Sequence, residues 1–242
     1  MEPALVLDIH THTIASGHAY GTIREMAAAA RDRGLRLLGF SEHAPGIPGT
    51  ISPTYFLNLK VVPRRLSGVE ILHGVELNCL PDGAGFEMQR RFLDGLDYAL
   101  VGIHSPCHKD QGREANTENL IACMRHPKVF FVSHPDDSHT PLDYPRLVEA
   151  AKELHVALEV NNNSLRSPQR RLNVVENYKT MLALCMEKRV PVLVSSDAHD
   201  PCDVGNFALA RELLTAVGFD WELVLNTSVD KLRDFLGCPG EG

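Results

Sequence analysis

The sequence predicts an α/β fold, a distorted, TIM-barrel-like parallel (β/α)7 barrel that forms a single domain over residues 1–242. Seven short apolar runs, rich in β-branched residues, alternate with helix-like segments along the chain. This alternation predicts a parallel sheet with right-handed crossovers, and about seven units are enough to close it. The 44% apolar content can fill one barrel-sized core, and no Gly- or Ser-rich linker divides the chain. A doubly wound open sheet is the alternative arrangement of the same units.

The seven runs lack the polar alternation of half-exposed strands, so we expect each to be covered on both faces. In chain order they are ALVLDIH, LRLLGFSEH, VEILHGVEL, YALVGIH, VFFVSHP, VALEVN and VPVLVSSDAH. The segments between them predict helices over residues 23–33, 117–125, 144–154, 173–188 and 206–216. We expect loops over residues 44–63, 112–116 and 161–171, on the face where such barrels hold their active sites.

Charge and targeting signals narrow the functional classes. The 24 basic and 31 acidic residues give a formal net charge of -7, and no basic run occurs, so we do not expect nucleic acid as a partner. The sequence shows no secretion signal and no apolar stretch of membrane-spanning length, which predicts a cytoplasmic protein without a membrane partner. The six cysteines form no C-x-x-C pair, so a zinc ribbon is not indicated.

Metal-binding residue types follow the predicted strands at the point where each strand ends. They are Asp8, His10 and His12 after the first strand, His43 after the second, Glu76 in the third, His104 and His134 after the fourth and fifth, and Asp197 with His199 after the seventh. The carboxyl ends of parallel barrel strands meet at one rim, so these side chains should converge. Residues at i and i+2 of a strand share a face, which lets His10 and His12, or Asp197 and His199, chelate one ion.

Glu76 ends an apolar run, where a buried carboxylate is costly unless hydrogen bonds or a cation balance its charge. A structural ion pair is one solution, and a bridge between two metals is the other. His104 and His134 each end an apolar strand shortly before a proline, which stops the strand from continuing. Two such histidines on neighbouring strands favour metal ligands over core packing. His18 lies in the loop after the first strand, where solvation is the ordinary role of a histidine.

The motifs D-I-H-T-H-T, S-E-H, G-V-E-L-N, G-I-H-S-P, S-H-P, E-V-N-N and S-S-D-A-H together resemble the PHP (polymerase and histidinol phosphatase) superfamily, and most closely its YcdX-type phosphatase branch. The similarity runs from Val6 to about Leu236. It implies three divalent metal ions per chain, usually zinc and sometimes manganese or iron. Many members have Asp where this chain has Glu42, which puts the orientation of His43 in question.

The resemblance also implies how the ligands divide among the three metals. The first metal would take His10, His12, Glu76 and Asp197, the second would share Glu76 and take His104 and His134, and the third would take His18, His43 and His199. Neutral imidazole is a ligand for zinc, iron and manganese. Relatives of this type can be trimeric, so a homo-oligomer is also expected.

This metal set predicts a phosphoesterase, most simply one that hydrolyses the phosphate monoester of a small metabolite. Metals a few ångströms apart activate a water and neutralise the charge that develops on the phosphoryl group. The candidate catalytic residues are Glu76, as a bridging carboxylate, and Asp197 and His199. We expect a metal-bound water to protonate the leaving group, or else Asp197 or His199 if that side chain is free enough of its metal. The candidate substrate-binding residues are Arg166, Arg170, Lys109 and Arg113 on the expected rim loops, with solvated surface charge as the alternative.

Three other functions are compatible with parts of the same pattern. The first is hydrolysis of histidinol phosphate, which the sequence does not separate from other phosphomonoesters. The second is a phosphodiesterase or exonuclease that acts on nucleic acid, which the net charge of -7 disfavours. The third is a metal-binding domain without catalysis, which the complete ligand set disfavours.

Overall fold

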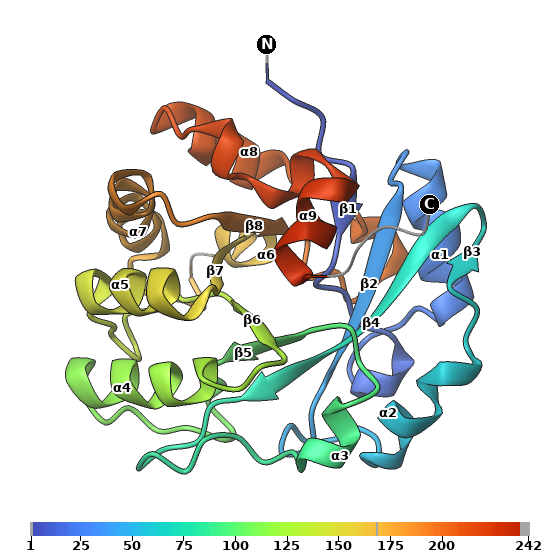
Figure 1. Ribbon diagram of the computed structural model, residues 1–242, viewed down its shortest axis with the longest axis horizontal. Helices are drawn as coiled ribbons and strands as arrows, with labels where there is room; N and C mark the ends of the chain where they lie inside the picture. The colour runs from blue at the N-terminus through green and yellow to red at the C-terminus, as the bar shows by residue number, and fades with distance from the viewer. Residues whose placement is uncertain (1, 168, 238–242) are drawn as a thin grey trace.

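The computed structural model describes residues 2–167 and 169–237. Seven parallel strands form a nearly closed barrel in the order β1-β2-β4-β5-β6-β7-β8, with helices around it (Figure 1). The strands are β1 (Leu7–Asp8), β2 (Leu37–His43), β4 (Val69–Asn78), β5 (Ala99–Gly102), β6 (Val129–Val132), β7 (Ala157–Asn161) and β8 (Val192–Ser195). A parallel bridge between Thr11 and Ala198 brings the first and last strands together. The predicted distorted (β/α)7 barrel is therefore confirmed.

The helices follow the strands in the predicted alternation. They are α1 (Ile23–Asp32), α2 (Thr54–Asn58), α3 (Arg90–Leu93), α4 (Arg113–Met124), α5 (Tyr144–Leu154), α6 (Asn162–Arg166), α7 (Val174–Lys188), α8 (Ala208–Ala216) and α9 (Val229–Leu236). Short 3-10 turns cover Ile14–Ser16, Leu59–Val61, Pro201–Asp203, Trp221–Leu223 and Leu225–Thr227. Local chemistry fixes several of the starts: Thr22 and Glu25 form a capping box on α1, and the side chain of Asp143 caps α5.

The expected loops are partly wrong. Residues 113–116 form the first turn of α4 instead of a loop, because Gly112, at a φ of 87°, turns the chain into the helix and Glu114 favours its N-terminal end. The segments 44–63 and 161–171 contain the short helices α2 and α6. The strand β3 (Arg65–Leu66), which the sequence analysis did not predict, pairs antiparallel with β4.

Two apolar layers hold the barrel together. The larger one lies between the strands and the surrounding helices, as parallel strands covered on both faces require. The smaller one joins residues near the amino ends of the strands, such as Leu37, Ala157 and Leu193, to the apolar face of α9. Because α9 packs at the amino ends, the opposite mouth, where the strands end, is left for polar side chains.

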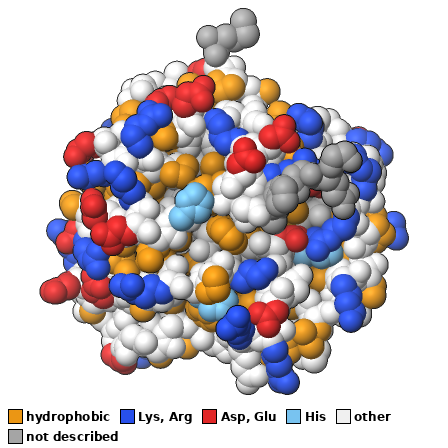
Figure 2. Space-filling view, viewed as in Figure 1, with side chains coloured by type: hydrophobic (Ala, Val, Ile, Leu, Met, Phe, Trp, Pro, Cys, Tyr) orange, Lys and Arg blue, Asp and Glu red, His pale blue; other side chains and the backbone are white. Residues whose placement is uncertain are grey.

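The surface carries both signs of charge. On the face shown in Figure 2, Lys and Arg side chains are interspersed with Asp and Glu, without a continuous basic stripe. Among the described residues, no helix combines the length and the apolar character that crossing a membrane requires.

Candidate metal centre

The structure gathers all nine predicted ligands at the carboxyl ends of the strands. His10 and His12 follow β1, His43 ends β2, Glu76 lies near the end of β4, His104 and His134 follow β5 and β6, Asp197 and His199 follow β8, and His18 follows the 3-10 turn Ile14–Ser16. Three overlapping trios have ligand atoms that all lie within 4.8 Å of one another: His10, His12 and Glu76; His12, His43 and His199; and His43, Glu76 and His104. The three ligand sets that the resemblance implies, here called the first, second and third groups, overlap with these trios. Their convergence is therefore a property of the fold, since the residues come from six different strands and their loops.

The first group has the spacing of a tetrahedral site. His10 Nε2 lies 3.4 Å from Glu76 Oε2 and 3.6 Å from Asp197 Oδ1. His12 Nε2 lies 3.6 Å and 3.2 Å from the same two oxygens. Four ligands bound to zinc at about 2.0–2.1 Å are about 3.3–3.4 Å apart in a tetrahedron. The four separations between a histidine nitrogen and a carboxylate oxygen are therefore close to those that one zinc ion requires.

Glu76 also faces a second group. Its Oε1 lies 3.1 Å from His104 Nε2 and 2.8 Å from His134 Nε2, whereas its Oε2 faces His10 and His12. The two oxygens of one carboxylate therefore point to two separate sets of imidazoles. That arrangement suits a carboxylate that bridges two cations.

The third group lies at the more open side of the centre. His18 Nε2 is 3.2 Å from His199 Nε2, and the rings of His18 and His43 stack with centroids 4.9 Å apart. His43 Nδ1 lies 2.9 Å from Glu76 Oε2, so this ring sits between the first and third groups. The geometry joins His18, His43 and His199 as neighbours.

Buried polar atoms without partners test whether a metal fits here. His10 Nε2, His12 Nε2 and Glu76 Oε2 are buried and have no hydrogen-bond partner among the described residues. Leaving such atoms unsatisfied is costly, and a cation placed among them would remove the cost. The donor set of imidazoles and carboxylates fits zinc, manganese or iron.

The pKa shifts of His12, His104 and Glu76 suit metal binding, whereas the pKa of His10 is raised well above its ordinary value, because the effect of burial is outweighed by Glu159 and Glu76 together. Burial, followed by the neighbouring His43 and His199, lowers the pKa of His12 well below its ordinary value. Burial likewise lowers the pKa of His104 to about 4. Burial alone would raise the pKa of Glu76, but the surrounding histidines, His10 first, hold it well below its usual range. Neutral imidazoles and an ionised carboxylate are the forms that ligate metals.

The departure at Glu42 has a clear structural consequence. Ser16 Oγ donates to Glu42 Oε2 at 2.6 Å, and Glu42 also accepts from the backbone N–H and hydroxyl of Thr13. The lone pairs of Ser16 Oγ then accept from His12 Nδ1 at 3.1 Å and from the backbone N–H of His43 at 3.0 Å. Glu42 therefore acts through Ser16, and this leaves His12 Nε2 as the nitrogen that faces Glu76 and Asp197.

Two ligands occupy unusual backbone conformations. His134 and Asp197 have φ values of 33° and 52°, in a region that non-glycine residues rarely adopt. Gly17, beside His18, has a φ of 82° and packs against the backbone of Gly49. Strained backbone is held by the structure around it, and it clusters at functional sites.

Comparisons with known proteins agree with this geometry. A probable phosphatase of Caldanaerobacter subterraneus subsp. tengcongensis is 41% identical over 237 residues, which cover 98% of this chain and 92% of the relative. A probable phosphatase of Clostridium novyi is 35% identical over 236 residues, with 98% and 96% covered. The chain belongs to this family of probable phosphatases. No family model matches it.

Solved structures share the fold of this phosphatase family member. The histidinol phosphate phosphatase of Lactococcus lactis, in complex with zinc, L-histidinol and phosphate, aligns with a TM-score of 0.61 at 18% identity, covering 89% of this chain and 95% of that one. A structure described as a candidate histidinol phosphatase of Listeria monocytogenes aligns with a TM-score of 0.64 at 18% identity, covering 84% and 99%. The family membership supports the predicted phosphatase, and the solved structures support the predicted barrel fold.

The arginine and lysine side chains predicted to bind substrate lie in different parts of this phosphatase family member. Arg170 lines a polar pocket of about 380 Å³ together with His18, Asn163, Asp197, His199 and Asp203, so this arginine adjoins the metal centre. Arg166 donates to Asp203 at 2.6 Å on the same rim. Arg113 instead lines a separate pocket beside the start of α5, and Lys109 is exposed. The structure thus brings Arg170, and Arg166 through Asp203, toward the centre, but not Arg113.

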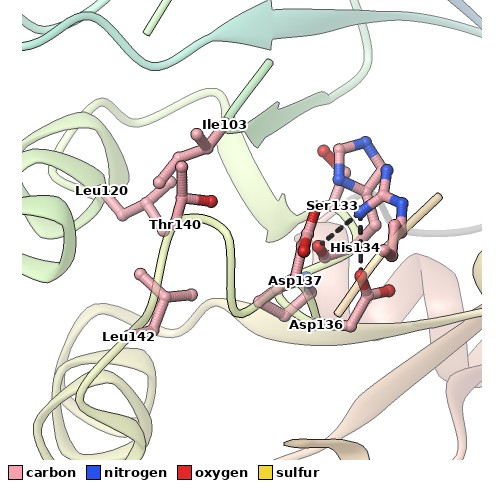
Figure 3. Close-up of a pocket in the computed structure, with 10 residues that line it drawn as sticks. Ile103, Leu120, Ser133, His134, Asp136, Asp137, Thr140 and Leu142 are labelled. Carbon is pink, nitrogen blue, oxygen red and sulfur yellow. Dashed lines mark hydrogen bonds and ion pairs between the residues drawn. The ribbon is translucent and has the colours of Figure 1, made fainter. Parts of the chain in front are cut away.

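A second, much smaller cavity adjoins His134. Figure 3 shows it between Ser133, His134 and Asp136 on one side and Ile103, Leu120, Thr140 and Leu142 on the other. Its volume of about 10 Å³ is close to the space that a single water needs. Of these two cavities beside the metal centre, the pocket next to Arg170 is therefore the one with room for a metabolite.

The sequence analysis missed three residues that support the ligands. Glu159 contacts His10 and His134, Ser16 contacts His12, and Arg171 contacts the carbonyl of His134 and the carboxylate of Asp136. Glu159 carried a signal in the sequence, since it is a carboxylate inside the apolar run VALEV, like Glu76 in its own run. Ser16 and Arg171 have no comparable signal, because their partners are distant in the chain.

Proposed function

We propose that the protein is a metal-dependent phosphomonoesterase that hydrolyses a small phosphorylated metabolite at a centre of three divalent metals, with zinc as the resident ion and manganese or iron as alternatives. The observation that carries this proposal is the convergence of nine imidazole and carboxylate side chains, among them the buried His10 Nε2, His12 Nε2, His43 Nδ1 and Glu76 Oε2, which have no hydrogen-bond partner among the described residues. Within the PHP superfamily, the motifs favour the YcdX-type branch. The whole chain, residues 1–242, would form the one catalytic domain.

Each ligand group would hold one metal. The first set is His10, His12, Glu76 and Asp197, the second is Glu76, His104 and His134, and the third is His18, His43 and His199. Bound there, divalent ions neutralise charge on the phosphoryl oxygens and lower the pKa of water. The chain must hold these ligands in place and guide the ester toward them.

The pocket side chains supply the remaining steps. Arg170 can donate two parallel hydrogen bonds to phosphate oxygens, and Asn163 lies beside it in the same pocket. His199 is the better placed of the two candidate proton donors, because 24% of its side chain is exposed whereas Asp197 is 10% exposed. His199 could protonate the leaving oxygen only when its Nε2 is free of metal, because its Nδ1 contacts the backbone carbonyl of Asp197 at 3.0 Å.

Phosphate release from p-nitrophenyl phosphate tests the proposal. Protein stripped of metal should be inactive, and Zn²⁺ or Mn²⁺ should restore turnover, because the ligand set fits these ions. Bis-p-nitrophenyl phosphate and single-stranded DNA should react much more slowly, and L-histidinol phosphate examines the alternative substrate. A metal-loaded protein that hydrolyses no phosphomonoester would contradict the proposal.

A further inference from the structure

Glu159 is a fully buried carboxylate that touches the ligands without belonging to their set. It lies in β7, and its side chain has no exposed surface. Its Oε1 accepts from His10 Nδ1 at 2.5 Å, and its Oε2 accepts from the backbone N–H of His134 at 2.6 Å. One residue therefore contacts a ligand of the first group and a ligand of the second group.

The bond to His10 decides which nitrogen faces the metal. An ionised carboxylate only accepts hydrogen bonds, so His10 Nδ1 must carry the proton that it donates to Glu159. His10 Nε2 is then the nitrogen that faces Glu76 and Asp197 and would offer its lone pair to a bound cation, and it has no hydrogen-bond partner among the described residues. A carboxylate behind a ligating imidazole fixes the ring orientation and strengthens the ligand.

The bond to His134 holds a strained backbone. His134 has a φ of 33°, and its N–H is directed at Glu159, while its carbonyl accepts from Arg171 at 3.4 Å. Without an acceptor, this buried N–H would favour a change of the local backbone. Such a change would move His134 Nε2 away from Glu76 Oε1, which it now meets at 2.8 Å.

Only a carboxylate satisfies all the donors around this position. Ser195 Oγ also donates to Oε1 at 2.5 Å, and Asn161 Nδ2 donates to Oε2 at 3.1 Å. A glutamine has one oxygen and one NH₂ group, so it would present donors to one of these two sides. It would lose either the bond to His10 or the bond to His134.

We propose that Glu159 is a positioning residue that joins the ligands of the first and second metals into one hydrogen-bonded unit, while the third group forms independently of it. This inference rests on the proposed function for the identity of the metals. It predicts that Glu159 controls how tightly two of the three ions bind. His18, His43 and His199 have no contact with Glu159 among the described residues, so the third site is an internal control.

This proposal can be tested by competition between the protein and a zinc chelator, which measures the affinity of each of the three bound zinc ions in turn. In Glu159→Gln, two of the three zinc equivalents should bind about 10–100-fold more weakly, and the third should bind as before. The control is Asn119→Ala, which removes two partly buried hydrogen bonds, from Gly83 and to Gln111, away from the centre. If Glu159→Gln fails to fold, Glu159→Asp, which keeps the charge but shortens its reach, should give the same split.

Three unchanged affinities, an equal weakening of all three, or the same split in Asn119→Ala would overturn the positioning role. The binding assay does not depend on turnover. If the affinities split as expected but the wild-type protein hydrolyses no phosphomonoester, the proposed function fails and the role of Glu159 stands. If the wild-type protein turns over but the affinities do not split, only the role of Glu159 fails.

Discussion

Replacing Gly17 with alanine should remove the third metal and leave the other two in place. A Cβ on Gly17 would lie 2.2 Å from the carbonyl oxygen of Gly49 and 2.4 Å from its carbonyl carbon. These are backbone atoms, so the loop that carries His18 must move by roughly 1 Å to reach an ordinary contact. Ligand distances at a metal tolerate about 0.2 Å. His18 Nε2 should therefore leave the position in which it meets His199 Nε2 at 3.2 Å.

Gly34→Ala is the matched control for this substitution. Gly34 has a φ of 75°, close to the 82° of Gly17, but an added Cβ would have no atom within 4 Å. Both variants should lose about 1–2 kcal/mol of stability from the left-handed conformation, and only Gly17→Ala should affect metal binding. We expect about two zinc ions per chain in Gly17→Ala and three in Gly34→Ala, measured by elemental analysis after dialysis. Three tightly held zinc ions in Gly17→Ala would show that the third site does not depend on the close contact between Gly17 and Gly49.

Two further predictions follow from the pocket and from a buried histidine. Arg170→Ala should raise KM for a phosphomonoester about tenfold, because one charge-assisted contact is lost. Arg113→Ala should leave KM unchanged, because Arg113 lines another pocket. Equal KM values for the two variants would contradict this prediction. Burial, followed by the charge of Arg64, lowers the pKa of His73 to about 4. In the unfolded chain the histidine has a pKa of about 6.5, so between pH 6.5 and pH 4 the unfolded chain binds more protons than the folded chain. The contribution of His73 to stability is therefore present above pH 6.5 and is lost as the pH falls toward 4. In urea unfolding, His73→Gln should reduce the stability loss between pH 7 and pH 5 by at most about 2 kcal/mol, and an identical loss in both proteins would show that His73 titrates normally.

The sequence predicted the barrel because its strands are buried on both faces and leave continuous apolar runs. It failed where local chemistry is decisive. Residues 113–116 have little apolar periodicity, so the first turn of α4 was not visible before the turn at Gly112 was known. The two-residue strand β3 is too short for a period, although Ser67 and Gly68, both with positive φ, form the tight turn that pairs it with β4.

The candidate metal ligands were easier to predict from the sequence than the residues that hold them in place. Eight of the candidate ligands stand at strand ends, and the parallel barrel brings all strand ends to one rim, so their positions indicated them. His18 lies in a loop and was indicated only by the family resemblance. Their partners depend on contacts between distant segments: Ser16 meets His12 and His43 only because the loop after β1 folds over β2. The separation of Arg170 from Arg113 was likewise invisible, because it depends on which loop or helix faces the pocket.

The proposed metal centre can be tested by anomalous scattering at the zinc absorption edge, measured from crystals of the zinc-loaded protein. We expect two peaks on opposite sides of the Glu76 carboxylate, one beside His10 and His12 and the other beside His104 and His134. A third peak should lie beside His18 and His199. Crystals that bind zinc only elsewhere, with no peak next to Glu76, would contradict the metal centre and the phosphatase mechanism that depends on it.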